Sequence, residues 1–501
     1  MLDTNPWDRA LVAQVQPTDW TNPVPSGRYD LVVIGAGTGG LVSAAGAAGL
    51  GGKVALIERH LMGGDCLTVG CVPSKGLLSA ARVWHTARRA AKDFAGPAIA
   101  AGDTGDFAAM MDRMRRIRSD LSPIDSAARF RSLGVDVFLG QGAFTDADTI
   151  SVGGATLTFR RAVIATGARA AAPPIPGLDA VPHRTNETIF DLTELPERLL
   201  IIGAGPIGSE MAQAFARFGS QVTLIDKSAR MLPRDDADAA QVVQAALQRD
   251  GVQFAGGVEI TGVSREAGGI HVRATRDGTP ADYVGDVLLV ASGRAPNVEG
   301  LQLERAGITF DRKGVTVDDR LRTTNSNVYA VGDVCSPLQF THAADFQARM
   351  VLQNALFFGR GKASDLITPW VTYTSPELAQ VGHTAASAAE AGVAIQSFTV
   401  PLHDVDRARL EGETEGFCRV HVRAGSDTIV GATIVAPNAG DMISEITLAM
   451  TNDLGLGAIG RTMHPYPTQG EVLRKVGDAY NRTRLTPFVR KVFGRYFRLF
   501  R

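Results

Sequence analysis

The hydrophobic pattern predicts a strand, a turn, a helix and a second strand, in an order that occurs twice along the chain. Each predicted strand is a short apolar run, and small apolar residues between the runs continue as a helix. The strands cover 29–34 and 54–57 in the first copy, and 199–202 and 221–225 in the second. A repeated unit of this kind indicates an α/β fold class.

The first strand of each copy runs directly into a turn with the spacing Gly-x-Gly-x-x-Gly. The glycines are Gly35, Gly37 and Gly40 in the first copy, and Gly203, Gly205 and Gly208 in the second. In such a turn the first glycine makes the bend, the second lets the backbone approach a pyrophosphate, and the third lets helix and strand pack closely. The N-terminus of the following helix attracts the anion.

An acidic residue follows the second predicted strand of each copy. Glu58 and Asp226 both lie 23 residues after the first glycine of their turn, where a carboxylate can bind a ribose hydroxyl. The pattern therefore predicts two dinucleotide sites. Asp226 would repel a 2′-phosphate and so favours NADH over NADPH, although Lys227 and Arg230 nearby could weaken that preference.

Length and composition set limits on the class of protein. A chain of 501 residues is too long for one hydrophobic core, so two to four domains are expected. A formal net charge of -1 gives no chain-wide attraction to nucleic acid, which excludes it as an expected partner. The first residues lack the basic start and apolar run of a signal peptide, and no apolar stretch reaches about 18 residues, so we expect a cytoplasmic protein.

Two of the four cysteines, Cys66 and Cys71, lie five residues apart in a glycine-rich segment. In a regular helix their Cα atoms would be about 8.6 Å apart, whereas a disulfide needs about 4.4 to 6.8 Å. The segment is therefore expected to be irregular, with Gly70 relieving the helix. Zinc would need about four ligands, and no second Cys/His cluster lies nearby, so no metal is predicted. Redox chemistry is favoured over buried structural thiols, and Cys335 and Cys418 are interpreted as inert.

The segment from Gly63 to Lys75, GGDCLTVGCVPSK, resembles the redox-active motif of the class I pyridine nucleotide-disulfide oxidoreductases. This family includes lipoamide dehydrogenase, glutathione reductase and mercuric reductase. The resemblance covers about 29–481. Further matching motifs follow in order: Ala165-Thr166-Gly167, Gly293-Arg-Ala-Pro-Asn297, Val328-Tyr-Ala-Val-Gly332-Asp333 and Tyr373-Thr-Ser-Pro-Glu-Leu-Ala-Gln-Val-Gly382.

The resemblance implies an architecture of two Rossmann-like dinucleotide-binding domains and a C-terminal α+β dimerisation domain. The expected boundaries are 1–170 and 297–363 for the FAD-binding domain, 171–296 for the NAD(P)-binding domain, and 364–480 for the dimerisation domain. The implied assembly is a homodimer in which the partner subunit completes each active site.

The resemblance also assigns roles to residues at matching positions. Cys71 corresponds to the flavin-proximal thiolate, and Cys66 to the interchange thiol that meets the substrate. Lys75 would lie near the flavin and pair with Glu210, and Asp333 would hold the ribityl chain of FAD. Gly64, Thr166, Gly167 and Gly293 belong to matching cofactor motifs. For His342, beside the expected flavin-contact segment, a structural role is equally open.

The C-terminal motif departs from the disulfide reductases of the family, in which a catalytic His-Pro precedes a Glu by five residues. Here Tyr466 stands five residues before Glu471, and His464 stands two residues earlier. That is the mercuric-reductase pattern, but the chain lacks adjacent C-terminal cysteines and an N-terminal CxxC module. We expect electrons to pass from NAD(P)H through FAD and the Cys66–Cys71 disulfide to a disulfide or thiol-bound metal substrate. Lipoamide dehydrogenase is the alternative, and a redox sensor or membrane-surface quinone reductase is the alternative of another class.

The segment 481–501 is predicted to be a basic amphipathic tail. From Arg482 onward it carries seven positive and no negative side chains. Apolar residues recur at helical spacing: Val489, Val492, Phe493, Tyr496, Phe497 and Phe500. The helix could pack on the dimer's own surface or bind weakly to anionic membranes.

Overall fold

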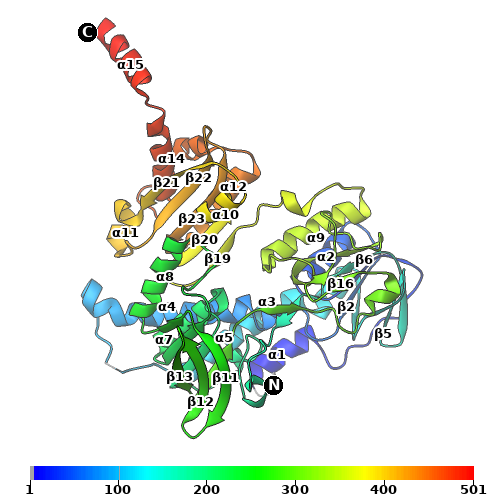
Figure 1. The fold of residues 1–501 in the computed structure, drawn as a ribbon. Helices are drawn as coiled ribbons and strands as arrows, with labels where there is room; N and C mark the ends of the chain where they lie inside the picture. Colours follow the sequence, from blue (N-terminus) through cyan, green and yellow to red (C-terminus); the bar gives the residue numbers. More distant parts are fainter. Residues whose placement is uncertain (1–4, 101) are drawn as a thin grey trace.

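The computed structural model describes residues 5–100 and 102–501, and it confirms the predicted α/β fold class (Figure 1). Three main sheets are built from different parts of the chain, with helices packed against them. The four predicted strands correspond to β1, β2, β8 and β9 to within one residue at either end. Apolar runs that are buried on both faces explain this agreement, because parallel strands covered by helices are apolar throughout.

The first sheet contains the first glycine turn. Its order is β3-β2-β1-β6-β5-β4, with β18 also paired to β6, and β1 lies parallel between β2 and β6. Helix α2 (Thr38–Gly49) begins directly after the turn and packs on β1 and β2 and against α9 (Thr341–Leu356). The strands are β1 (Tyr29–Ile34), β2 (Val54–Glu58), β3 (Val135–Leu139), β4 (Ala143–Asp146), β5 (Thr149–Val152), β6 (Ala155–Ile164) and β18 (Val328–Ala330).

The second sheet contains the second glycine turn and is parallel throughout, in the order β10-β9-β8-β14. Helix α7 (Pro206–Phe218) follows the turn, and α8 (Ala237–Arg249) follows β9. A separate antiparallel sheet follows in the chain. The strands are β8 (Arg198–Ile202), β9 (Gln221–Asp226), β10 (Gln253–Gly256) and β14 (Val287–Val290), and then β11 (Glu259–Glu266), β12 (Gly269–Arg276) and β13 (Thr279–Gly285).

The third sheet is antiparallel, in the order β19-β20-β23-β22-β21, and packs against α12 (Ala439–Thr451) and α14 (Glu471–Thr483). The strands are β19 (Trp370–Thr372), β20 (Glu377–Gly382), β21 (Ile395–Pro401), β22 (Phe417–Arg423) and β23 (Ile429–Ala436). Smaller elements are β7 (Ala168–Ala170) paired with β15 (Arg294–Pro296), β16 (Phe310–Asp311) paired with β17 (Gly314–Val315), α6 (Ala127–Ser132), α10 (Ala385–Glu390), α11 (Asp406–Glu411) and α13 (Leu456–Arg461).

Helix α4 (Cys71–Phe94) shares one hydrophobic core with the second and third sheets. Its buried residues Leu77 and Leu78 belong to one hydrophobic core that also includes residues of α5 (Phe107–Leu121), α7 and the third sheet. The first residue of α4 is one of the two candidate redox cysteines. A short helix, α3 (Gly64–Thr68), carries the other cysteine, and α1 (Pro6–Val15) packs against α5.

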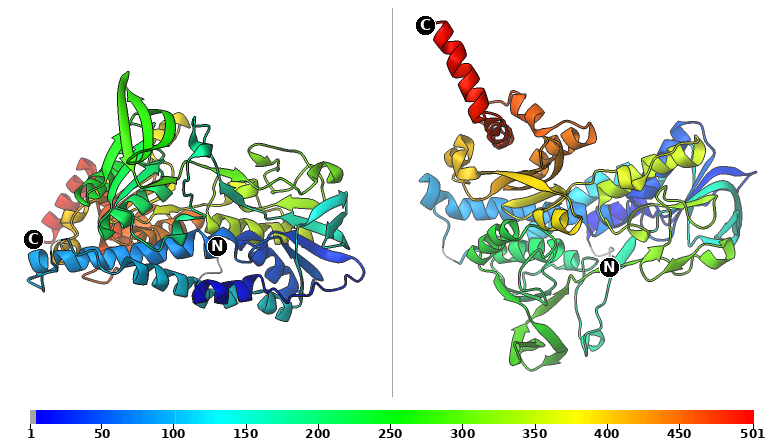
Figure 2. Two further views of the ribbon diagram at one scale, coloured as in Figure 1. Left: turned by 90° about the horizontal axis from the view of Figure 1, so that it is seen from below. Right: turned by 45° about the horizontal axis from the view of Figure 1, so that its top comes forward.

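The C-terminal helix α15 (Pro487–Leu499) projects away from the rest of the molecule (Figures 1 and 2). It contains no buried residue, so it has no packing partner that would fix its apolar side chains. Among the described residues, no helix is both long and apolar enough to cross a membrane. The sheets follow the predicted order of domains, while the domain boundaries themselves stay a prediction.

Candidate active site

The two candidate redox cysteines lie at a break between helices. Helix α3, which carries Cys66, ends at Thr68, and α4 begins at Cys71 after Gly70. A Cβ atom on Gly70 would lie 2.6 Å from the backbone oxygen of Asp65, so this close approach requires glycine. The irregularity predicted from the cysteine spacing is therefore present. Both cysteines are free thiols in this chain.

The surroundings of the two sulfur atoms differ in a way that separates their ionisation. The hydrogen bond with Cys66 lowers the pKa of Cys71 to about 6, and Thr341 and the charge of Lys75 act in the same direction. The Thr341 hydroxyl lies 3.3 Å from the Cys71 sulfur. The same pairing, together with burial, raises the pKa of Cys66. These surroundings make Cys71 the more readily ionised of the pair and favour the protonated form of Cys66.

Thr341 was not identified in the sequence. It is the first residue of α9, 270 positions from Cys71 in the chain. The one available signal was the neighbouring His342, which was considered for a flavin contact. Its Nε2 lies 2.6 Å from the Pro369 carbonyl, and its ring stacks on Phe340 at 5.5 Å. These contacts support the structural role for His342.

Lys75 and Glu210 form the ion pair that the resemblance implies. The Lys75 ammonium lies 2.9 Å from Glu210, whose side chain is 5% exposed. The Tyr373 backbone N–H donates to the other oxygen of Glu210 at 2.9 Å, and the Tyr373 ring lies 4.5 Å from Lys75 Nζ. Burial lowers the pKa of Lys75, but the charge and hydrogen bond of Glu210 outweigh that effect and raise it overall. Lys75 therefore stays positive, one helical turn after the Cys71 thiolate.

The two glycine turns have the same steric constraints. Gly35 and Gly203 have φ values of +99° and +109°, which other residues rarely adopt. A Cβ atom on Gly40 or Gly208 would lie 1.8 Å from the oxygen of the first glycine of its own turn. Helix and strand can therefore approach each other this closely only with glycine at these positions. By contrast, Gly205 has no atom within 4 Å of an added Cβ, so the space beside the second glycine is open to a ligand.

Glu58 and Asp226 also have matching contacts. Glu58 accepts hydrogen bonds from the backbone N–H groups of Ala36 at 2.7 Å and His60 at 2.8 Å. Asp226 accepts from Ala204 at 2.7 Å and from Ser228 at 2.6 Å. Each carboxylate thus holds its glycine turn in place. A carboxylate has about four acceptor sites, so both keep capacity for ribose hydroxyls.

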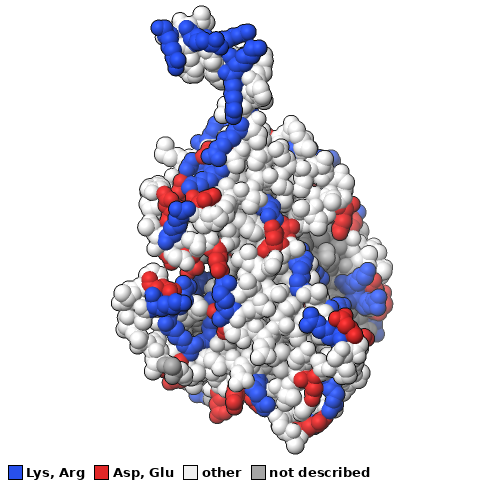
Figure 3. Space-filling view, turned by 60° about the vertical axis from the view of Figure 1, so that its left-hand side comes forward, with Lys and Arg blue, Asp and Glu red and all other residues white. Residues whose placement is uncertain are grey.

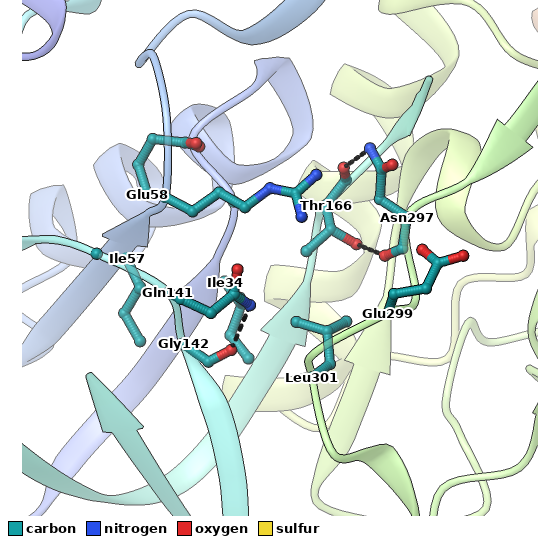
Figure 4. A pocket seen from close by; sticks show the side chains of 12 residues that line it. Ile34, Ile57, Glu58, Gln141, Gly142, Thr166, Asn297, Glu299 and Leu301 are labelled. Carbon is teal, nitrogen blue, oxygen red and sulfur yellow. Dashed lines mark hydrogen bonds between the residues drawn. The ribbon is translucent and has the colours of Figure 1, made fainter. Parts of the chain in front are cut away.

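Glu58 lines a pocket together with Gly35, Thr166 and Asn297 (Figure 4). Thr166 Oγ1 donates to the Asn297 carbonyl at 2.7 Å, and the Asn297 amide donates to the Thr166 carbonyl at 2.9 Å. These bonds join the end of the first sheet to the segment after β15. The cavity, the glycine turn and the carboxylate together fit the adenosine end of a dinucleotide such as FAD.

Asp333 lies in a charged cluster with Arg294 and Asp65. Arg294 Nη2 is 2.5 Å from Asp65, and Arg294 Nε is 3.3 Å from Asp333. Burial raises the pKa of Asp333 against the opposing effect of Arg294. Arg294 follows Gly293 in its motif but had no assigned role. It links Asp65, directly before Cys66, to the carboxylate expected to hold the ribityl chain.

The three predicted C-terminal residues have separate partners. His464 Nε2 lies 3.2 Å from both oxygens of Glu445, and its Nδ1 lies 3.0 Å from the Thr462 carbonyl. Tyr466 is 70% exposed, and its hydroxyl donates to Asp406 at 3.0 Å. Glu471 accepts from Arg474 at 2.7 Å. Within the described part of the chain no hydrogen bond joins these three to each other or to the cysteine pair, so their catalytic roles stay predictions.

The remaining cysteines match the interpretation that they are inert. Burial raises the pKa of both Cys335 and Cys418 to about 12, so they remain thiols at neutral pH. In residues 5–100 and 102–501, no group of three or more His, Cys, Asp or Glu side chains is placed to hold a metal ion.

Comparison with known proteins identifies both parts of the chain. The family model described as "Pyridine nucleotide-disulphide oxidoreductase" matches 29–348, and the model of that family's dimerisation domain matches 368–476. Mercuric reductase from Bacillus cereus is 35% identical over 447 residues, which cover 89% of this chain and 70% of that protein. Dihydrolipoyl dehydrogenase from Thermus scotoductus is 34% identical over 465 residues, 91% of this chain and 98% of that protein. The HOCl-induced flavoprotein disulfide reductase RclA from Escherichia coli has a similar structure, with a TM-score of 0.79, 30% identity, and coverage of 90% of this chain and 99% of that one.

Proposed function

The chain belongs to the pyridine nucleotide-disulphide oxidoreductase family, and we propose that within it the protein reduces a disulfide or a thiol-bound metal ion, as a mercuric-reductase-like enzyme. It is a FAD-dependent oxidoreductase that uses NAD(P)H, and its dimerisation domain indicates a homodimer. The observation that carries the proposal is the contact set of Cys71. This sulfur lies at the start of α4, beside Thr341 and within reach of the Lys75 charge.

Bound FAD supplies a ring that accepts hydride from NAD(P)H and passes two electrons to a disulfide. In the proposed cycle, two electrons and one proton convert the Cys66–Cys71 disulfide into a Cys66 thiol and a Cys71 thiolate. Cys66 then loses its proton and attacks one sulfur of the substrate, releasing the first substrate thiol. Cys71 attacks the resulting mixed disulfide at Cys66, which restores the Cys66–Cys71 disulfide and releases the second substrate sulfur as a thiolate that takes a proton from solvent. Lys75, held by Glu210, stabilises the Cys71 thiolate throughout.

A substrate panel tests the proposal. The purified dimer and NADH are combined in turn with lipoamide, glutathione disulfide, Hg(II) in excess thiol, and quinones. Multiple turnovers with a disulfide or with Hg(II), lost in Cys66→Ser while NADH still reduces the flavin, are the expected result. Turnover confined to lipoamide would favour lipoamide dehydrogenase. Turnover confined to quinones and kept in Cys66→Ser would contradict the proposal and favour the quinone reductase. Reduction of the flavin by NADH without turnover of any substrate would contradict it and favour the redox sensor.

We also propose that NADH is preferred to NADPH. The Asp226 carboxylate holds the second glycine turn and would repel a 2′-phosphate. Arg230, which could otherwise attract that phosphate, donates to the carbonyls of Leu232, Pro233 and Asp235 at 2.8 to 2.9 Å. Its guanidinium is thus already engaged by backbone oxygens, which leaves Asp226 as the stronger influence.

For the substrate-facing residue supplied by the partner subunit, we propose Tyr466. Its side chain is largely exposed and has one hydrogen bond, to Asp406. Both ring nitrogens of His464 face oxygen atoms of its own chain, from Glu445 and Thr462. His464 can act as a base only by leaving one of these contacts, whereas Tyr466 can reach a partner's cysteine pair from a solvent-facing position.

The C-terminal tail supports a second proposal, weak association with anionic membranes at the inner face of the cytoplasmic membrane. On α15 the apolar side chains are exposed, Phe488 by 74%, Phe493 by 51% and Phe497 by 58%. Basic side chains cover the projecting segment (Figure 3). An apolar face bordered by arginines and lysine fits the boundary between headgroups and acyl chains.

Vesicle co-sedimentation tests the role of the tail. The full chain should sediment with vesicles of acidic lipid and less with neutral vesicles, and deletion of 487–501 should abolish the difference. The matched variant Phe493→Ser/Phe497→Ser keeps every charge, and its loss of sedimentation would show that the apolar face inserts. Equal sedimentation of the full and shortened chains would overturn the proposal.

A further inference from the structure

A second cavity, of about 240 Å³, opens beside Cys66, the expected interchange cysteine. Its walls come from α2, from the segment around α3, and from the end of α5 with the short turn that follows it. Most of the lining is aliphatic, and the residues that matter here are Leu41, Val42, Leu121 and Ile124. Leu121 is 38% and Ile124 is 55% exposed. Large apolar side chains left open beside a reactive sulfur indicate a binding surface for an aliphatic group.

The one charged side chain in the cavity lining is Asp125. No hydrogen bond or ion pair to its carboxylate is found among residues 5–100 and 102–501, and it is partly exposed to the cavity. The nearest positive group is Arg129, whose guanidinium donates to the Ile124 carbonyl at 2.6 Å and stacks near Phe130. Arg129 is not part of the cavity lining. A ligand in the cavity therefore meets a negative charge and no lining lysine or arginine.

We propose that Asp125, in this cavity on the path of the substrate to Cys66, makes the enzyme select neutral or cationic disulfides with aliphatic arms over anionic disulfides. The proposal rests on the proposed function, because it concerns the substrate that reaches Cys66. A substrate carboxylate about 8 Å from Asp125, at an effective dielectric constant of about 20, would bind about 30-fold more weakly than a neutral group. Glutathione disulfide, which carries several carboxylates, is thus a poor substrate for this enzyme.

Two pairs of disulfides test the charge selection, because the members of each pair differ mainly in charge. Lipoamide and lipoate share the dithiolane ring, and cystamine and dithiodiglycolate are short linear disulfides of opposite charge. Burial raises the pKa of Asp125, so the assays are run at about pH 8, well above the usual range of a carboxyl group. The expected kcat/KM is at least about tenfold higher for lipoamide than for lipoate and for cystamine than for dithiodiglycolate.

Variants of Asp125 and of its neighbour Ile124 separate the effect of charge in the cavity from the effect of aliphatic contact. Asp125→Asn should bring both ratios close to one, and Asp125→Lys should invert the cystamine ratio. The matched control is Asp120→Asn, which removes an exposed carboxylate of α5 that does not line the cavity. Ile124→Ser should lower kcat/KM for lipoamide and lipoate alike, because both lose the same aliphatic contact.

A salt series keeps the test decisive even if an Asp125 variant fails to fold. Raising the ionic strength from about 0.02 to 0.5 M should reduce the lipoamide preference of the unmodified enzyme, since screening weakens charge repulsion. Ratios that do not change with salt or with Asp125→Asn overturn the charge selection. The proposed function fails separately, if NADH reduces the flavin but two thiols never appear at Cys66 and Cys71.

Discussion

The N-terminal helix α1 reaches the redox segment through a buried ion pair. Asp8 is 4% and Arg118 is 1% exposed, and their side chains are 2.5 Å apart. Arg118 also donates to the Thr68 carbonyl at 2.5 Å, at the end of the helix that carries Cys66. A second guanidinium, that of Arg115, lies 3.9 Å from Asp8. The Asp8 carboxylate therefore faces two buried guanidinium groups, and Asp8→Ala would remove this negative charge from both Arg115 and Arg118.

The cost of Asp8→Ala follows from what Arg118 would retain. Its remaining partner is the Thr68 carbonyl, while Arg115 keeps Asp112 and the carbonyls of Phe190 and Leu192. Removing one partner of a buried ion pair costs about 3–5 kcal/mol, because the other charge stays buried without compensation. We expect this loss in the free energy of unfolding. The control Asp112→Ala removes a carboxylate that is 53% exposed, and it should cost about 0–1 kcal/mol.

The assay is urea unfolding followed by flavin release, which reports on the part of the chain that contains α1, with far-UV circular dichroism as the second probe. Iodoacetamide labelling of Cys66 in the reduced enzyme should also accelerate in Asp8→Ala, since Arg118 without Asp8 holds the Thr68 carbonyl less firmly. Equal unfolding free energies for Asp8→Ala and Asp112→Ala would refute the reasoning. They would mean that Arg118 reaches solvent once its partner is gone.

Three further predictions concern the chemistry. Two-electron reduction should give the long-wavelength absorbance of a thiolate beside oxidised flavin, and Cys71→Ser should lack this absorbance. Because the Cys71 pKa is lowered to about 6, the absorbance should be present above pH 6 and be lost as the pH falls through that value. The ratio of kcat/KM should favour NADH, and Asp226→Asn should reduce that ratio; an NADPH preference in the unmodified enzyme would contradict the role of Asp226. His464→Ala should flatten the pH dependence of kcat near neutrality with a dithiol substrate, and an unchanged pH profile would remove His464 from the mechanism. Tyr466→Phe should leave flavin reduction by NADH intact but lower turnover, by up to about 100-fold if Tyr466 transfers the proton.

Features encoded in a few neighbouring residues could be predicted from the sequence. The strands β1, β2, β8 and β9 were found because buried strands are continuous apolar runs. The glycine turns were found because backbone sterics leave no alternative residue where a Cβ atom would overlap a carbonyl. The irregular segment between Cys66 and Cys71 followed from helix geometry alone. These inferences needed no knowledge of how distant parts of the chain meet.

The partners of the charged groups were decided by the tertiary structure. His464 pairs with Glu445 of helix α12, 19 positions away, although spacing had directed attention to Glu471. Arg294 meets Asp65 across 229 positions of the sequence. The ion pair of Lys75 with Glu210 was anticipated only through the family resemblance, since 135 positions separate the two residues. Each of these contacts depends on how elements that are separate in the sequence pack together.

The sequence by itself thus determined the α/β fold class, the two glycine turns with their carboxylates, and the irregular segment that carries Cys66 and Cys71. The tertiary structure decided which groups surround the two sulfur atoms, what holds helix α3 in place, and which charge lines the cavity beside Cys66. The physical reason is the distance along the chain over which each effect acts. Periodicity and backbone sterics act over a few residues, whereas the pKa of Cys71, the burial of Arg118 and the exposure of Asp125 depend on groups that only packing brings within a few ångströms.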